Sequence, residues 1–361
     1  MPPYGKHPET IVRQESPFNA GPPPGRLRAA VVTPNDLFFV RNHGGVPAVD
    51  ARSFRLEIGG AVERPLSLAL ADLEARPQRV VTATLECAGN RREELAALRP
   101  IPHELPWGSE AISTAVWSGV PLGELLREAG PSAGAEHVEF EGLDETERRG
   151  ERLRFGGSVP LAKALAPETL LALEMNGAPL PAVHGYPVRA LVPGWIGARS
   201  VKWVYRVVVR PTPSDNYFQA VAYRLFPAAV GPESVVWEEG MMLGEQALTS
   251  IVTTPAPGAR IAAGAVRVAG LAYVGGGRSI ERVELSLDGG GSWLSTRLTT
   301  PPEPWTWRFW EAEVVLPPGA HEALARAWDS AGQTQPESPA QVWNFKGYMN
   351  NAWARSAFSA A

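Results

Sequence analysis

The pattern of apolar residues changes near 244–254, and this change constrains the architecture more than any other feature of the chain. Before it, helical and strand-like patterns are mixed without a regular strand–helix–strand rhythm, which is typical of an α+β domain. After it, almost every segment alternates between apolar and polar residues, as short strands do. The clearest of these later segments are 265–270, 283–287, 311–316 and 323–328. Many short strands at regular spacing favour an immunoglobulin-like sandwich.

We therefore predict an extended lead-in at 1–36, an α+β domain at 37–244 and an all-β immunoglobulin-like sandwich at 245–361. Three consecutive prolines, 22–24, stiffen the lead-in. In the α+β domain the pattern predicts helices at 121–129, ended by Gly130, and at 161–165, and strands at 54–58, 80–85 and 199–210.

Composition narrows the class of protein. The chain has 36 Gly and 35 Pro among 361 residues, so turns are frequent, which fits a strand-rich fold. The net charge is −4 and the basic residues are scattered, so the sequence does not indicate nucleic-acid binding. No apolar run approaches the roughly 18 residues of a membrane span, and neither a secretory signal nor a peroxisomal tripeptide is seen. We expect a cytoplasmic protein, or a periplasmic one if the chain is a trimmed mature form.

Cys87 is the only cysteine, so an internal disulfide is excluded. A small buried hydrophobe, a reactive nucleophile and a metal ligand remain as roles. Ala88 and Gly89 leave little bulk beside the sulfur, and Arg91 and Arg92 are expected to favour the thiolate. A thiolate beside arginines suits a soft metal that handles an oxyanion. We interpret Cys87 as a metal ligand.

Another candidate site follows the apolar run 37–40, where three polar residues stand together. They are Arg41, Asn42 and His43. One interpretation is a solvated strand end. The other is an anion site, because Arg offers a rigid fork and His a directional donor.

Other cofactor and catalytic chemistries find less support. No c-type haem motif is possible with one cysteine, and His43 with its two following glycines lacks the proline of a cytochrome b5 turn, so we expect no haem. A protease built from Cys87, His184 and Asp144 has no local signature. The six histidines occur singly, without the spacing of a zinc site.

Collinear segments over nearly the whole chain resemble the sulfite oxidase family. They are 37–43, 84–92, 111–117, 137–144, 174–177, 184–203, 275–278, 342–347 and 351–353. The resemblance implies a molybdopterin-binding domain of the sulfite oxidase fold, followed by an immunoglobulin-like dimerisation domain, and a molybdenum cofactor.

The resemblance also implies roles for individual residues. Cys87 matches the thiolate that ligates molybdenum. The positions that match the substrate pocket are Arg41, Arg92, Trp107 and Tyr223. The positions that match the pterin and phosphate contacts are Phe39, Val40, Arg41, Asn42, His43, Asp144, His184, Arg189, Ser200, Val201 and Lys202.

One position departs from the family. Lys346 stands where animal and plant sulfite oxidases are expected to carry a substrate-pocket arginine. Lysine keeps the positive charge but loses the bidentate fork, which puts the affinity for substrate, and its identity, in question.

These observations lead to the hypothesis of a molybdenum-dependent oxidoreductase that oxidises sulfite to sulfate, with oxygen or a cytochrome as electron acceptor. The alternatives are a nitrate reductase-like or sulfoxide reductase-like molybdoenzyme on the same scaffold, or a non-catalytic binding protein built on the sandwich. Seven tryptophans follow residue 290, more than one core needs. We expect some of them at a surface, and a homodimer made mainly by the C-terminal domains.

Overall fold

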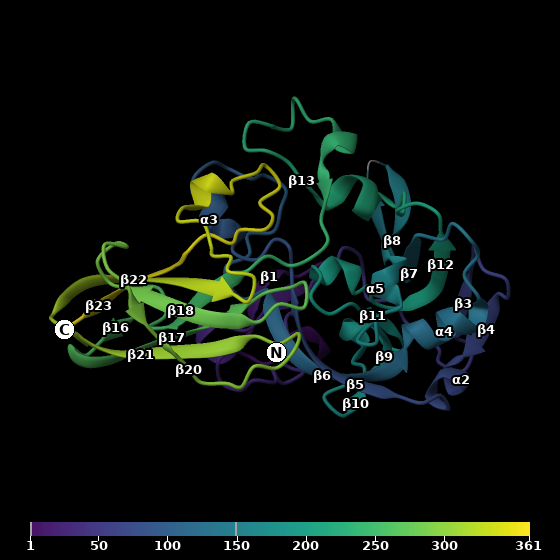
Figure 1. Cartoon of the computed structure of the whole chain (residues 1–361), viewed down its shortest axis with the longest axis horizontal. Helices are drawn as coiled ribbons and strands as arrows, with labels where there is room; N and C mark the ends of the chain where they lie inside the picture. The colour runs from purple at the N-terminus through teal and green to yellow at the C-terminus, as the bar shows by residue number, and fades with distance from the viewer. Residues whose placement is uncertain (1, 149) are drawn as a thin grey trace.

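The computed structural model describes residues 2–148 and 150–361, and β-strands dominate it (Figure 1). The elements up to residue 175 are η1 (Pro3–Gly5), β1 (Ile11–Gln14), β2 (Asn19–Gly21), α1 (Pro24–Leu27), β3 (Arg55–Gly60), β4 (Leu66–Ala69), α2 (Leu70–Glu74), β5 (Arg79–Glu86), α3 (Arg92–Ala96), β6 (Ile112–Pro121), α4 (Leu122–Ala129), β7 (His137–Arg148), β8 (Glu151–Pro160), α5 (Leu161–Ala164) and β9 (Leu170–Met175).

The middle of the chain contains β10 (Ala178–Pro179), η2 (Ala182–His184), β11 (Arg189–Leu191), η3 (Gly197–Arg199), β12 (Val204–Arg210), η4 (Phe218–Ala222), β13 (Arg224–Leu225), η5 (Trp237–Glu239) and β14 (Met241–Met242). The remainder contains β15 (Thr249–Thr254), β16 (Arg260–Ile261), β17 (Gly264–Tyr273), β18 (Ile280–Ser286), β19 (Leu294–Ser295), β20 (Arg297–Leu298), β21 (Arg308–Leu316), β22 (Gly319–Asp329), η6 (Pro339–Gln341) and β23 (Ala354–Ala360).

An antiparallel sheet and a mixed sheet form the first part of the molecule. One has the order β10-β9-β6-β5, with β11 also paired to β9, and the other has the order β4-β3-β12-β7-β8. In the second sheet β12 runs parallel to β3 but antiparallel to β7. In the first, β5 and β6 are antiparallel, with Glu86 opposite Ile112. Strand β5 therefore delivers Cys87 at its end, beside the start of β6.

Helix α4 has the spacing of apolar residues by which its sequence predicts a helix. Its buried side chains recur at i, i+3, i+4 and i+7, and they are Leu122, Leu125, Leu126 and Ala129. Burying each leucine contributes roughly 1.5–3 kcal/mol. Gly130 then ends the helix with φ 69°, in the left-handed region that glycine adopts without strain. This confirms the predicted helix and its end.

The sequence prediction was wrong about two segments. The expected extended lead-in contains the β1–β2 hairpin, and it is tied down by buried Lys6, whose Nζ lies 2.6 Å from the carbonyl oxygens of both Asn35 and Phe38. The strand expected at 199–210 begins only at Val204, because the backbone first makes the turn η3 and then bends at Trp203, which has φ 51°.

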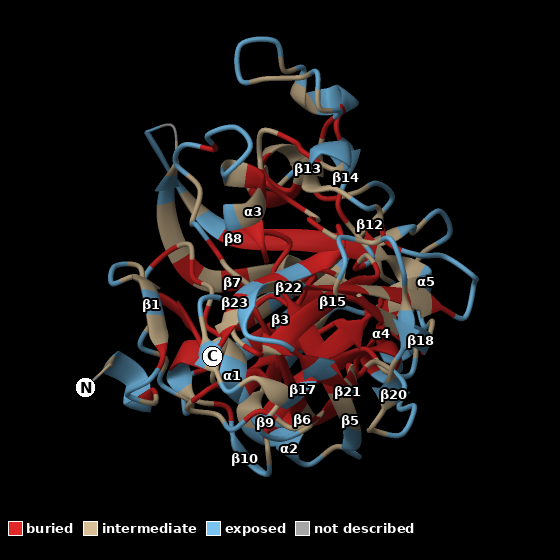
Figure 2. Cartoon of the chain, turned by 90° about the vertical axis from the view of Figure 1, so that its left-hand side faces the viewer, coloured by how far each residue is buried: buried red, intermediate tan, exposed pale blue. Residues whose placement is uncertain are grey.

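The C-terminal part is a two-sheet sandwich, as the alternation predicts. Its sheets have the orders β15-β17-β21-β20 and β16-β23-β22-β18-β19. Inward residues of both sheets, among them Val268, Val283 and Ala325, form one apolar core. Figure 2 shows that the strands at the centre of the molecule are mostly buried.

The first part of the molecule and the sandwich share an apolar contact. Residues of the sandwich, including Ile251, Tyr273 and Trp307, pack in one buried cluster with Leu27 and Ile112. Hydrogen bonds reinforce the contact, because the Trp307 amide donates to Thr84 Oγ1 at 3.0 Å and the Tyr273 hydroxyl donates to the Thr84 carbonyl at 3.2 Å.

We expected some of the seven tryptophans after residue 290 to lie at a surface, and most of them are buried. Trp307, Trp310, Trp343 and Trp353 are buried, and Trp293, Trp305 and Trp328 are partly exposed. Trp307 packs against the first part of the chain, which accounts for one aromatic without any partner molecule. Among the described residues, no helix is long and apolar enough to cross a membrane.

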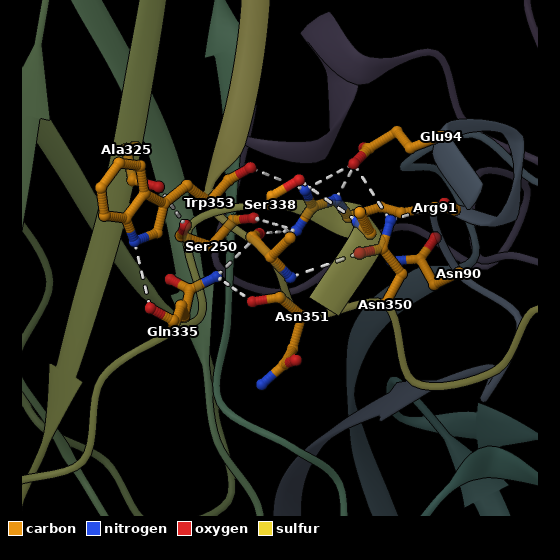
Figure 3. Close-up of polar contacts among 12 residues, drawn as sticks. Asn90, Arg91, Glu94, Ser250, Ala325, Gln335, Ser338, Asn350, Asn351 and Trp353 are labelled. Atoms are coloured by element: carbon orange, nitrogen blue, oxygen red, sulfur yellow. Dashed lines mark hydrogen bonds and ion pairs between the residues drawn. The ribbon is translucent and has the colours of Figure 1, made fainter. Parts of the chain in front are cut away.

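A second contact between the two parts is polar, and Arg91 lies at its centre (Figure 3). The guanidinium donates to the carbonyl oxygens of Ala352 at 2.7 Å and Trp353 at 3.1 Å, and it pairs with Glu94 at 2.8 Å. Asn350 returns a hydrogen bond to the Arg91 carbonyl at 2.9 Å. Arg91 therefore faces the C-terminal segment. The expectation that it raises the potential at Cys87 is wrong, because φ 61° at Arg91 turns its side chain away.

We expect Arg91→Met to lower the free energy of unfolding by about 2–4 kcal/mol, because it leaves the buried Trp353 carbonyl without a donor and removes the charged partner of Glu94, which keeps only Asn350. Urea denaturation followed by circular dichroism measures this. Arg52→Met is the matched control, because its side chain is 92% exposed, and we expect it to change stability by less than about 0.5 kcal/mol. Equal stability of the two variants would contradict a stabilising role for the Arg91 contacts.

Candidate active site

A partly open cavity lies around Cys87, with about 630 Å³ of empty space when the solvent at its mouth is included. Its lining residues are Phe38, Phe39, Arg41, His43, Leu85, Cys87, Asp144, Phe155, His184, Arg189, Gly197, Ala198, Ser200, Lys202, Trp203 and Tyr223. They come from segments far apart in the sequence, so only the folded chain assembles this site.

Cys87 is 6% exposed and presents the only thiol of the chain to this cavity. Its backbone amide continues the strand by bonding the Ala111 carbonyl at 2.9 Å. Gly89 lies directly under the Arg92 side chain, since a Cβ there would come within 2.4 Å of Arg92 Nη2. Burial raises the pKa of the Cys87 thiol, and Arg41 and Arg92 offset only part of the rise. The expected thiolate is therefore disfavoured by burial, and a cation bound at the sulfur would favour it.

One end of the cavity collects cationic side chains. Arg189 is 4% exposed, and it donates to the carbonyls of His184 and Ser200 at 3.0 Å each, while its Nε has no hydrogen-bond partner among the described residues. Burial lowers the pKa of Arg189 to about 9. Lys202 Nζ bonds Asn42 Oδ1 and the Val183 carbonyl. Burial, and then the neighbouring Arg189, lower the pKa of Lys202 well below its ordinary value.

Asp144 is the one carboxylate in the lining of this cavity, and burial raises its pKa. Its Oδ1 has no hydrogen-bond partner among the described residues. The lining also carries Arg41, Arg189 and Lys202, so potential positive charge exceeds negative charge in a desolvated space. Such a space favours an anionic ligand, because isolated buried charge is costly.

Three further lining residues of this cavity, Arg41, His43 and Tyr223, are joined in a row by hydrogen bonds. Arg41 Nη2 lies 3.1 Å from His43 Nδ1, and His43 Nε2 lies 2.8 Å from the Tyr223 hydroxyl. Burial, and then Arg41, lower the pKa of His43 well below its ordinary value, so the ring is neutral. Because Arg can only donate, Nδ1 accepts and Nε2 donates to the Tyr223 oxygen.

This tautomer leaves the Tyr223 proton free to donate to a ligand. Burial raises the pKa of Tyr223 to about 12, so the hydroxyl stays protonated at neutral pH. The turn after His43 depends on Gly44, because a Cβ there would lie 2.0 Å from the Glu145 carbonyl oxygen. The close approach of this turn to β7 holds the ring of His43 in place.

A second, larger cavity of about 1,670 Å³ shares Arg41 and His43 with the first. Glu104, Lys346 and Tyr348 lie in its lining. The shared residues mark the place where the two cavities adjoin.

Arg92 is buried between the two parts of the chain. Its Nη1 donates to the Leu105 carbonyl at 2.8 Å, and its Nε donates to the Lys346 carbonyl at 3.1 Å. Gly347, with φ 62°, permits this contact, since a Cβ there would lie 2.6 Å from Arg92 Cγ. Lys346 Nζ in turn pairs with Glu104.

The structure gathers most of the residues selected from the sequence, but not all. Val40, Val201 and Trp107 are buried in apolar clusters, and Arg92 is buried between the two parts of the chain. None of these four residues lines either cavity. Residues missed from the sequence are Phe38, Phe155, Trp203, Glu104 and Tyr348. Phe38 and Trp203 adjoin selected residues and could have been included, whereas Glu104 lies in a loop without any pattern.

Comparisons with known proteins agree with this geometry. Residues 43–218 match the family described as Oxidoreductase molybdopterin binding domain, and residues 241–360 match the Mo-co oxidoreductase dimerisation domain. The chain is 44% identical to sulfite oxidase of Gallus gallus and 41% identical to mitochondrial sulfite oxidase of Homo sapiens. These matches cover 97% of this chain, and 78% and 66% of the two relatives.

A solved structure is similar over the same extent. The sulfane dehydrogenase SoxCD from Paracoccus pantotrophus superposes with a TM-score of 0.82 at 28% identity, and the match covers 96% of this chain and 88% of that one. The similarity includes both parts of the molecule, so the predicted arrangement of an α+β domain followed by an all-β sandwich is confirmed.

We expect Arg189→Met to retain about tenfold less pterin than the unmodified protein, because it removes a charged donor from the cationic end of the cavity. Fluorescence of the oxidised pterin released from purified protein measures this. Arg206→Met, whose side chain is 51% exposed and pairs with Glu141, is the control and should retain the full amount. Full retention in Arg189→Met would show that the anionic part of the cofactor binds elsewhere.

Proposed function

The chain belongs to the sulfite oxidase family of molybdenum oxidoreductases, and we propose that it oxidises sulfite to sulfate in the cavity around Cys87. The observation that carries the proposal is the meeting of three features in one cavity. They are the single thiol, a desolvated cationic end, and a tyrosine held as a hydrogen-bond donor by neutral His43.

The donors present fit a molybdenum–molybdopterin cofactor. Cys87 would supply the thiolate, a soft ligand of the type that suits this metal. The cationic end, with the unpaired Nε of Arg189, would hold the phosphate of the pterin. The bound cofactor would supply the transfer of an oxygen atom to sulfur and would take up two electrons.

The residues of the chain would bind and orient the anion. Arg41 lies where the two cavities adjoin, so it can attract an oxyanion from the larger cavity toward Cys87. The Tyr223 hydroxyl donates to an oxygen of the anion, since His43 occupies its acceptor side. Lys346 adds positive charge from the lining of the second cavity, and Arg92 adds it from behind Lys346. Both side chains also have protein partners.

Sulfite is proposed over nitrate because sulfite oxidases are the closely similar relatives reported above, and the cavity itself does not distinguish two small oxyanions. The hypothesis of a non-catalytic binding protein is wrong, since residues 43–218 match an oxidoreductase domain. The electron acceptor is proposed to be oxygen or a soluble cytochrome.

We expect about one molybdenum per chain and turnover of sulfite, but not of nitrate, when both are assayed in parallel with oxygen and cytochrome c as acceptor and with reduced viologen as donor for nitrate. Cys87→Ser offers a harder oxygen ligand, so we expect at least a 100-fold loss of sulfite turnover. Metal analysis of the same samples separates loss of metal from loss of chemistry. Full activity of Cys87→Ser, or turnover of nitrate alone, would refute the assignment.

We also propose a homodimer formed mainly by the sandwich, supported by the match of residues 241–360 to a dimerisation domain. Closed two-fold dimers are the commonest assembly of soluble oligomers. Partly exposed Trp293 and exposed Leu294 are apolar surface of the sandwich that an interface could cover.

Light scattering at micromolar concentration should give about twice the 38.8 kDa of one chain. A dilution series distinguishes a stable dimer, whose mass stays constant, from weak association. A mass of one chain at every concentration would contradict the proposal.

A further inference from the structure

Glu104 and Lys346 face each other at the second cavity from opposite parts of the molecule. Glu104 lies in the loop between α3 and β6, and Lys346 lies in the segment that leaves the sandwich after η6 and runs beside α3 (Figure 1). Their side chains form an ion pair, and they are only 17% and 18% exposed. The pair therefore joins the two parts of the chain in a partly desolvated place.

Arg92 belongs to the same cluster. Its Nη2 lies 3.6 Å from Glu104 Oε2, and its Nε donates to the Lys346 carbonyl. Burial acts to raise the pKa of Glu104, but Arg92 and then Lys346 outweigh it and hold the pKa below its ordinary value. Glu104 is thus a carboxylate at neutral pH, between two cations of the proposed substrate site.

A carboxylate at this position competes with an anionic substrate. Like charges repel each other more strongly in a partly desolvated cavity than in bulk water, so Glu104 repels an incoming anion. A doubly charged oxyanion is repelled more strongly than a singly charged one. Sulfate is doubly charged at neutral pH, whereas sulfite is divided between the singly and the doubly charged form, so sulfate is repelled more on average. Glu104 also accepts a hydrogen bond from Lys346 Nζ that an anion could otherwise accept.

We propose that Glu104 is a specificity-determining residue that weakens the binding of doubly charged tetrahedral oxyanions, so that sulfate binds poorly and leaves readily after it forms. The inference rests on the proposed oxidation of sulfite. Lys346 suits this role better than arginine would, because an ammonium on a flexible stem can exchange Glu104 for an anion without breaking a bidentate pair.

A purely structural role is the competing explanation. Under that role the ion pair holds the segment around Lys346 against Arg92, and its loss would lower stability and turnover without improving the binding of any anion. The two explanations predict opposite changes in the affinity for sulfate, so that affinity is the quantity to measure.

The experiment compares Glu104→Gln, Lys346→Met and the double variant with the unmodified holoenzyme. Inhibition of sulfite oxidation by sulfate gives one affinity, and calorimetric titration with sulfate gives a second that needs no turnover. In Glu104→Gln we expect sulfate to bind on the order of tenfold more tightly, with a smaller fall in KM for sulfite and no rise in kcat. In Lys346→Met, where Glu104 keeps Arg92 as a cationic partner but Lys346 no longer offsets its charge, we expect sulfate to bind more weakly.

The double variant tests whether the two residues act through each other. We expect its affinity for sulfate to lie between those of the single variants and to depart from the sum of their effects. Glu147→Gln removes the same charge from the lining of the same cavity, but no ion pair joins Glu147 to Arg92 or Lys346 among the described residues. This control should change the affinity for sulfate by less than about twofold.

Unchanged or weaker binding of sulfate in Glu104→Gln would overturn the inference, as would an equal effect in Glu147→Gln. If Glu104→Gln fails to fold, stronger or unchanged binding in Lys346→Met would overturn it instead. Absence of sulfite oxidation by the unmodified holoenzyme would refute the proposed function, and the calorimetric titration would then still report on Glu104 separately.

Discussion

The burial of positive charge without enough negative charge is the constraint on which the rest of the structure depends. Arg189 and Lys202 lie in a desolvated cavity that offers them backbone carbonyls and Asp144. Protein interiors tolerate such groups only at a cost, and the lowered pKa values of both side chains express that cost. An anionic cofactor relieves it, so the stability of the fold and the binding of the cofactor are linked.

The site also depends on contact between the two parts of the molecule. The adjacent residues Arg91 and Arg92 make different contacts there. Arg91, with its left-handed backbone, directs its side chain toward Ala352 and Trp353. Arg92 lies beside Gly89 and Lys346. The sandwich thereby supplies Lys346 and Tyr348 to the second cavity. The part of the chain that matches a dimerisation domain therefore lines part of the second cavity.

Sequence reasoning succeeded where the signal was local. The spacing of leucines in α4 and the alternation in β17 and β22 depend on neighbours within a few residues, and the structure has all three elements. Cys87 was predicted to be a metal ligand because it is the only cysteine and lies in a distinctive motif, and the structure places it in the lining of the first cavity. Reasoning failed where the partner is remote: Lys6 contacts His184, and Glu104 pairs with a residue 242 positions away. No periodicity records such pairs.

The direction of Arg91 could not be predicted for a different reason. Two adjacent arginines look equivalent in a sequence, and only a backbone angle separates them. The rise in the pKa of Cys87 likewise depends on how completely the cavity is desolvated, which composition does not reveal.

The central claim is that the cavity around Cys87 holds a molybdenum cofactor that oxidises sulfite. A single-turnover experiment tests it most directly: one equivalent of sulfite is added, without oxygen or any other acceptor, to molybdenum-loaded oxidised protein, and sulfate and the absorption of the molybdenum centre are measured. The account predicts close to one sulfate per molybdenum and a simultaneous change in absorption. Sulfite that remains unchanged beside an oxidised, fully loaded centre would contradict it.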